Sequence, residues 1–198
     1  MEQDHSDETE NHAFHCGEHK ETIDGRTEMI TLKRPNKELE KEALAFKQEF
    51  IDYGEPTING SELLDQIDSY EKWLKSVTDN TSPDTVNPSW VVTDTYFAFD
   101  DNDRLVGIID LRHELNAFLK DFGNCGYSVR PSERRKGYAT EMLRLMKQHA
   151  NEIGMKRLQL SVERINEPSV KTIVKNGGRY ERSFLFEGEE ADIYMIDL

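Results

Sequence analysis

The feature that most constrains this chain is a basic, glycine-containing turn between a predicted strand and a long predicted helix. A run predicted to be a strand ends at Val129, and Pro131 stops it. The residues around Gly137 then lead into a helical pattern that begins at Tyr138. Backbone N–H groups at a helix N-terminus, next to basic side chains, are well suited to hold a phosphate. The chain is therefore expected to bind a phosphate-bearing ligand between a strand and a helix.

The common nucleotide-binding motifs do not explain this turn. The sequence contains neither Gly-x-x-x-x-Gly-Lys-Ser/Thr nor Gly-x-Gly-x-x-Gly. Residues 130–157 carry eight Lys/Arg and three Asp/Glu, although the whole chain has a net charge of -14. An acidic chain disfavours nucleic acid as a partner and suits a cationic substrate such as an amine. The local reversal of charge therefore indicates an anion site on an otherwise acidic protein.

The composition divides the chain into a tail and one domain. Residues 1–28 hold nine Asp/Glu and two Lys/Arg without periodicity, which predicts a disordered acidic tail before a domain over 29–198. The tail contains four residues with spacings that a metal could use: His12, His15, Cys16 and His19. A segment without a folded frame does not hold ligands in place, so no metal site is expected there.

Hydropathy and cysteine content suggest a cytoplasmic protein. No run approaches the roughly 18 apolar residues that cross a bilayer, and no apolar segment follows a basic N-terminus as in a signal peptide. Only Cys16 and Cys125 occur, so a structural disulfide is not expected. We therefore predict no membrane association and a reducing compartment.

Hydrophobic periodicity predicts alternating helices and strands. Helices are expected at 36–53, 61–79, 138–153 and 166–176, with a short one near 115–119. Strands are expected at 29–32, 90–99, 105–111, 123–129, 157–162, 180–186 and 193–196. This order predicts an α/β (α+β) domain.

The basic turn and its flanks closely resemble the acetyl-CoA motif of the GNAT N-acetyltransferase superfamily. The resemblance runs from Gly126 to Leu143, and Asn166-x-x-Ser169 followed by Gly177 resembles the family's next motif. More loosely, residues 29–198 are similar to a bacterial subgroup of predicted acetyltransferases. The resemblance implies the GNAT fold, with a mixed central sheet of about six to seven strands and helices on both faces.

The same resemblance implies an activity. An enzyme of this family would move an acetyl group from acetyl-CoA to a primary amine of a small-molecule or peptide acceptor by direct transfer, without a metal, and could form a homodimer. An alternative is a GNAT-fold module that binds or senses acetyl-CoA or CoA and catalyses weakly. The implied cofactor-binding residues are Tyr127, Ser128, Val129, Arg134, Arg135, Lys136, Gly137, Tyr138, Ala139, Thr140, Asn166 and Ser169.

The catalytic residues are less defined, because the chain departs from the family pattern. Ile173 occupies the position where many members carry a tyrosine acid, and Gly123 and Asn124 stand where many carry a glutamate. The base therefore stays open among residues at predicted strand ends, with an alternative acid in the last strand. The candidates are His113, Glu114 and Glu163 as base, Tyr194 as acid, and Arg112, His113 and Asn116 as substrate-binding residues.

Overall fold

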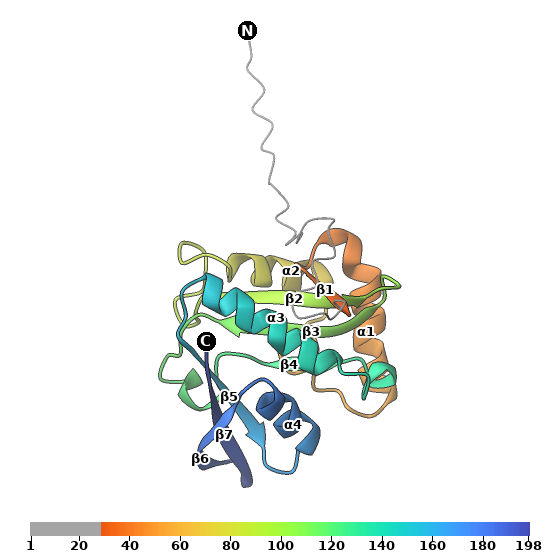
Figure 1. Cartoon of the computed structure of the whole chain (residues 1–198). Coiled ribbons are helices and arrows are strands. Elements are labelled where there is room, and N and C mark those ends of the chain that lie inside the picture. Colours follow the sequence, from red (N-terminus) through yellow and green to blue (C-terminus); the bar gives the residue numbers. More distant parts are fainter. Residues whose placement is uncertain (1–28) are drawn as a thin grey trace.

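The computed structural model describes residues 29–198 (Figure 1). The predicted tail over 1–28 and its four potential metal ligands lie outside the described residues. The described part contains seven strands and four α-helices, which confirms the α/β prediction and the strand number. Their bounds are β1 (Ile30–Lys33), α1 (Glu40–Asp52), α2 (Tyr70–Asp79), β2 (Thr93–Asp100), β3 (Leu105–Arg112), β4 (Tyr127–Val129), α3 (Tyr138–Glu152), β5 (Arg157–Glu163), α4 (Glu167–Lys175), β6 (Arg179–Phe186) and β7 (Glu189–Asp197).

The first sheet has the order β1-β2-β3-β4, with antiparallel pairing throughout. Helices cover both of its faces (Figure 1). Because side chains alternate along each strand, apolar residues of β2 reach both faces and pack against helices on each. Phe97 and Phe99 of β2 pack on one face with α1 and α2, where Trp73 is completely buried. Tyr96 and Ala98 face the other way, toward the buried stripe of α3.

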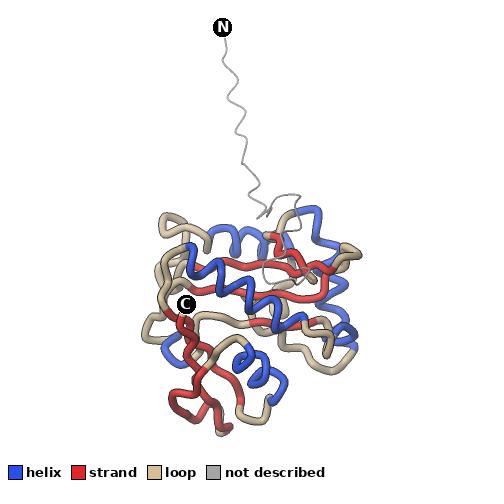
Figure 2. The backbone as a smooth tube through the Cα atoms, viewed as in Figure 1, coloured by secondary structure: helices blue, strands red, loops and turns tan. Residues whose placement is uncertain are grey.

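The second sheet has the order β5-β7-β6 and carries the C-terminal part of the chain (Figure 2). The alternation of Leu158, Leu160 and Val162 buries one face of β5, as the sequence predicts. Helix α4 contacts both β5 and α3. It begins after Asn166, whose side chain accepts a hydrogen bond from the Ser169 N–H at 3.2 Å.

The two sheets meet at one short junction. Gly123 and Leu160 form an isolated bridge, and the Asn124 N–H donates to the Gln159 carbonyl at 2.7 Å. Beyond this point β4 pairs with β3 and β5 pairs with β7, with no ladder joining β4 to β5 in the described chain. The facing edges of β4 and β5 are therefore left open to a ligand.

The predicted helix over 61–79 is wrong in its first half. The helix begins at Tyr70 with Ser69 as its N-cap, and Leu63, expected on the buried face, is 57% exposed. Residues 61–66 form turns instead, because this loop folds over Trp73, whose indole N–H donates to the Ser61 carbonyl at 2.8 Å. Such a long-range contact is not visible in local periodicity.

Two further boundaries are corrected. The strand predicted over 123–129 is regular only at Tyr127–Val129, because Gly123 and Asn124 bond to the second sheet at the junction. The short helix expected near 115–119 is a 3₁₀ turn at Leu119–Asp121. Asn116 stands just before that turn, and its side chain accepts hydrogen bonds from the N–H groups of Phe118 and Leu119.

Candidate functional site

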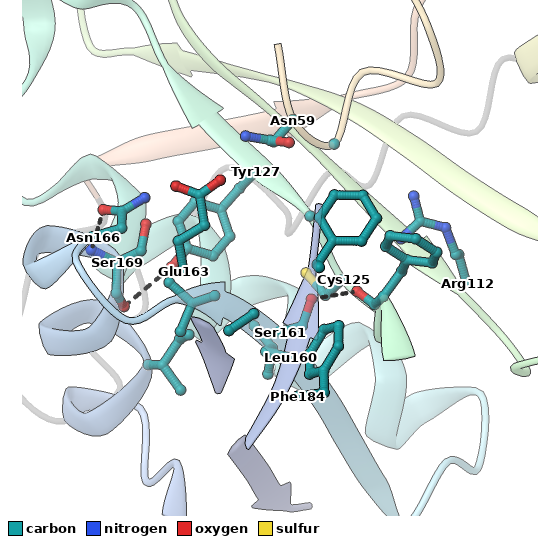
Figure 3. A pocket seen from close by; sticks show the side chains of 17 residues that line it. Asn59, Arg112, Cys125, Tyr127, Leu160, Ser161, Glu163, Asn166, Ser169 and Phe184 are labelled. Atoms are coloured by element: carbon teal, nitrogen blue, oxygen red, sulfur yellow. Dashed lines mark hydrogen bonds between the residues drawn. The ribbon is translucent and has the colours of Figure 1, made fainter. Parts of the chain in front are cut away.

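A pocket of roughly 270 Å³ lies between the two sheets, at the open edges of β4 and β5 (Figure 3). In Figure 3, Tyr127, Glu163, Asn166 and Ser169 lie toward one end, and Arg112 and Cys125 toward the other. The whole lining is Asn59, Gly60, Arg112, Phe122, Cys125, Gly126, Tyr127, Leu160, Ser161, Val162, Glu163, Asn166, Ser169, Ile173, Phe184, Phe186 and Ala191. The pocket therefore joins three predicted cofactor-binding residues (Tyr127, Asn166 and Ser169) to one predicted substrate-binding residue, Arg112.

The backbone of β4 offers hydrogen bonds to this pocket. The carbonyl of Gly126 and the N–H of Arg130 both bond to β3, at 3.0 and 2.8 Å. Because backbone groups alternate in direction along an antiparallel strand, those of Tyr127 and Val129 turn toward the opposite edge. An extended ligand arm that lies between the sheets can pair with these two residues.

The basic turn lies beyond the end of β4, at the N-terminus of α3. Gly137 is the N-cap residue with φ +92°, and no side chain caps the helix. A Cβ at Gly137 would meet only the end of the Met29 side chain, at 3.9 Å, so the space above the first turn is open. This geometry fits a phosphate group, since the first N–H groups of the helix and its dipole point into open space.

The three cations of the turn differ in their partners. Arg134 forms a bidentate pair with Glu55 at 2.6 and 2.9 Å, and Lys136 pairs with Glu133 at 2.5 Å. Arg135 is exposed with φ +68° and has no ion pair within residues 29–198. Arg135 is thus the one cation of the turn that is not already paired with a carboxylate of residues 29–198.

At its other end the pocket is bordered by a buried charge cluster. The Arg112 Nη2 lies 2.8 Å from Asp110 Oδ2 and 3.5 Å from Glu62 Oε1. Asp110 is fully buried and its Oδ1 accepts the Gly126 N–H at 2.6 Å. Burial, with the charge of Asp110 adding to it, raises the pKa of Glu62 to about 7 against the attraction of Arg112.

Sequence reasoning missed both carboxyl groups of this cluster. Asp110 interrupts the otherwise apolar run over 105–111, and a lone acid in a buried strand was the available signal. Glu62 gave no signal, because it lay in a segment interpreted as helix. Only the folded loop before α2 brings Glu62 to Arg112.

His113 does not line the pocket. Its Nε2 lies 2.8 Å from Asp94 Oδ2, which also lies 2.8 Å from the Nε2 of His149, and Arg34 donates to the other oxygen at 2.6 Å. Burial alone would raise the pKa of Asp94, but these hydrogen bonds and the Arg34 charge hold it well below its usual range. In this structure His113 therefore belongs to a separate polar cluster on the α3 side of the sheet.

Of the other predicted catalytic and substrate-binding residues, some line the pocket and some lie outside it. Glu163 lines the pocket and is exposed. Tyr194 is buried in β7 opposite Leu160, and neither Tyr194 nor Asn116 is part of the pocket lining. Ile173 does line the pocket, so an aliphatic side chain stands where the family tyrosine was expected.

The structure thus combines an open strand pair with a basic turn before a helix, the arrangement that the resemblance to the GNAT family implies. The sequence profile of the Acetyltransferase (GNAT) domain matches residues 30–179. The chain therefore belongs to the GNAT acetyltransferase family. No curated protein matches the sequence.

Solved structures support the same fold at low sequence identity. RimL, a ribosomal L7/L12 α-N-protein acetyltransferase in complex with CoA, superposes with a TM-score of 0.64 at 14% identity, covering 86% of this chain and 94% of that one. MccE, a microcin C7 self-immunity acetyltransferase in complex with acetyl-CoA and AMP, gives 0.63 at 16%, covering 86% and 93%. SpeG, a spermidine/spermine N-acetyltransferase from Vibrio cholerae, gives 0.60 at 13%, covering 85% and 94%.

Two further features of the described residues concern membrane-spanning helices and groups of metal-binding side chains. Within residues 29–198, no helix is long and apolar enough to span a bilayer. The same residues contain no group of three or more His, Cys, Asp or Glu side chains placed to hold a metal ion.

Proposed function

We propose that this protein is an N-acetyltransferase that moves the acetyl group of acetyl-CoA directly to a primary amine. The observation that carries the proposal is the pocket between β4 and β5, whose lining runs from Arg112 to Tyr127, Asn166 and Ser169. Residues 134–140 would hold the pyrophosphate, and the backbone of Tyr127 and Val129 would pair with the pantetheine arm. Asn166 and Ser169 line the opposite wall.

Acetyl-CoA supplies an acyl group already activated as a thioester. The amine nitrogen attacks the thioester carbon, a C–N bond forms, and the C–S bond breaks. The oxyanion formed on the way needs a hydrogen-bond donor, for which the cleft-facing N–H groups of Val129 and Tyr127 are suited. The sulfur leaves as a thiolate and takes up one proton.

The amine must lose protons, because a lysine-like ammonium has a pKa near 10.4. We assign proton acceptance to Glu62 through an intervening water, since Glu62 does not itself line the pocket. Its pKa of about 7 suits a base that works near neutral pH. Glu163, a carboxylate on the pocket wall, is the alternative acceptor.

The two carboxyl groups can be distinguished by pH profiles of kcat. Glu62→Gln is expected to lower kcat by about 100-fold near pH 7 and to remove the acidic limb of the profile, with KM for acetyl-CoA unchanged. Glu163→Gln is the matched comparison. If Glu163→Gln alone changes the acidic limb, Glu163 is the base and the assignment of Glu62 is wrong.

The donor site is tested by two substitutions at opposite ends of α3. Gly137→Glu puts a side chain and a negative charge into the space above the first turn, so CoA binding should be lost in calorimetry. Gly154→Glu is the control, because Gly154 also has positive φ and open space around it but follows the C-terminal end of the helix. Equal CoA affinity of the two variants would refute the proposed pyrophosphate site.

The alternative is a module that binds acetyl-CoA but catalyses weakly, and Ile173 in place of a tyrosine motivates it. Release of free thiol from acetyl-CoA over a panel of amines separates the two functions. Turnover above buffer hydrolysis with any amine would exclude the pure binding module.

A further inference from the structure

Four aromatic rings form a continuous row beside the Arg112 end of the pocket. The centroids of Trp90 and Phe118 lie 6.4 Å apart, those of Phe118 and Phe122 5.4 Å, and those of Phe122 and Phe186 5.2 Å. We call these residues the aromatic row. They come from three separate segments: the residues before β2, the turn after β3 and the end of β6.

The aromatic row continues from the pocket wall to the surface. Phe122 and Phe186 line the pocket together with Phe184. Phe118 is 67% exposed and Phe186 is 40% exposed. Aromatic surface left open to water beside a pocket is typical of a binding site for an apolar group.

Charge near the aromatic row favours a ligand with one positive charge. Arg112 stacks over Trp90 at 5.8 Å and is flanked by the two carboxyl groups of Asp110 and Glu62. This cluster has a net charge between zero and -1, depending on the protonation of Glu62. The cluster therefore does not repel one ammonium group of a ligand. Its arginine is already paired, so it does not attract a ligand carboxylate.

Inside the pocket, no acid of the described wall lies at the Arg112 end. Among the described residues that line the pocket, the one acidic side chain is Glu163, which Figure 3 places at the end opposite Arg112. Asp121, which follows Phe118 in the turn after β3, is paired with Arg182 at 2.6 Å.

We propose that the acceptor is a primary amine that carries one aromatic or large aliphatic group. The apolar group lies on the aromatic row and the amine reaches past Arg112 into the pocket. This inference rests on the proposed acetyltransferase function and specifies its substrate class.

The test measures both binding and turnover, using four amines. 2-Phenylethylamine and ethylamine differ only by the ring, spermidine adds positive charges, and a peptide with N-terminal phenylalanine presents the same ring on a polypeptide. Kd is measured on the CoA-loaded protein by calorimetry, and kcat/KM by thiol release from acetyl-CoA. We expect 2-phenylethylamine or the peptide to exceed ethylamine and spermidine about tenfold in both affinity and kcat/KM.

Two variants connect that preference to the aromatic row. Phe118→Ala should raise Kd and KM for the aromatic amine about three- to tenfold and leave those of ethylamine and acetyl-CoA unchanged. Leu44→Ala is the control, because Leu44 is an exposed apolar side chain (45%) on α1. Since Phe118 is mostly exposed, its loss should not prevent folding.

The outcomes separate this inference from the proposed function. Preference for either ring-bearing amine that Phe118→Ala reduces supports the inference, and the preferred one tells whether the source is a small molecule or a peptide. Equal or better binding of spermidine or ethylamine overturns the inference while leaving the acetyltransferase function intact. Ring-dependent binding without turnover of any amine supports the row as a ligand site and contradicts the catalytic function.

Discussion

Replacement of Gly60 by alanine should destabilise the protein through a direct collision of two backbones. Gly60 has φ +72°, and a Cβ placed there would lie 2.1 Å from the Gly126 carbonyl oxygen and 2.7 Å from the Tyr127 nitrogen. The left-handed conformation alone costs a non-glycine residue about 1–2 kcal/mol. Overpacking against backbone adds about 1–3 kcal/mol, because the loop must move away from β4.

Gly54→Ala separates the two contributions. Gly54 has nearly the same φ, +73°, but nothing lies within 4 Å of the position that its Cβ would occupy. At about 2–4 °C per kcal/mol for a chain of this size, Gly54→Ala should lower Tm by about 2–8 °C and Gly60→Ala by about 4–20 °C. Gly60→Ala should also weaken CoA binding, since Gly60 and Gly126 both line the pocket.

Differential scanning calorimetry of both variants with and without CoA gives the measurement. The reasoning is refuted if the Tm values of the two variants agree within about 2 °C, the effect of less than about 1 kcal/mol. It is also refuted if Gly60→Ala is less stable but binds CoA as tightly as the unmodified protein.

Three further predictions concern ionised groups. The folded protein holds a proton on Glu62 up to about pH 7, whereas the unfolded chain releases it near 4.5. The free energy of unfolding should therefore fall between about pH 5 and 8 in the parent protein, and fall less in Glu62→Gln. Parallel profiles of Tm against pH for the two proteins would contradict this. Asp94→Asn removes a buried carboxylate with three donors and should cost about 3 kcal/mol by urea denaturation, and a change below about 1 kcal/mol would count against its structural role. Glu55→Gln releases Arg134 from its bidentate pair and should tighten CoA binding about two- to fivefold by calorimetry, whereas weaker binding would show that the pair positions Arg134 for the phosphate.

Most of the fold could be predicted from the sequence, because most elements have a strong local signal. The stripe of α3 and the alternation in β5 gave their elements and buried faces directly. The first half of the predicted second helix was wrong, because the spacing of Leu63 and Ile67 suits a helical face but also occurs in a loop. Leu64, rather than Leu63, enters the core, and both Glu62 and Leu63 adopt positive φ. Only contact with Trp73 and β4, far along the chain, decides that conformation.

The residues of the candidate site also fall into two groups, those that belong to a local sequence motif and those that only the fold brings together. The basic turn and Asn166 were found because they are local motifs, and the structure places Tyr127, Asn166 and Ser169 on one pocket. The cluster of Arg112 with its two carboxyl groups could not be found, since its members come together only through the fold. His113 was a reasonable candidate at a strand end, but Arg112 and His113 point to two different sides, and His113 joins the Asp94 cluster.

The short junction at Gly123 and Leu160 has a consequence for how this protein can change over time. The basic turn belongs to the chain between β4 and α3, whereas Phe184, Phe186 and Ala191 of the pocket wall belong to the β6–β7 hairpin. If the proposed function holds, substitutions in the hairpin change the acceptor wall of the pocket and substitutions in the basic turn change the pyrophosphate site, so the effects of these two sets should add. Under that function, selection can vary the hairpin without changing the basic turn that would hold the donor phosphates.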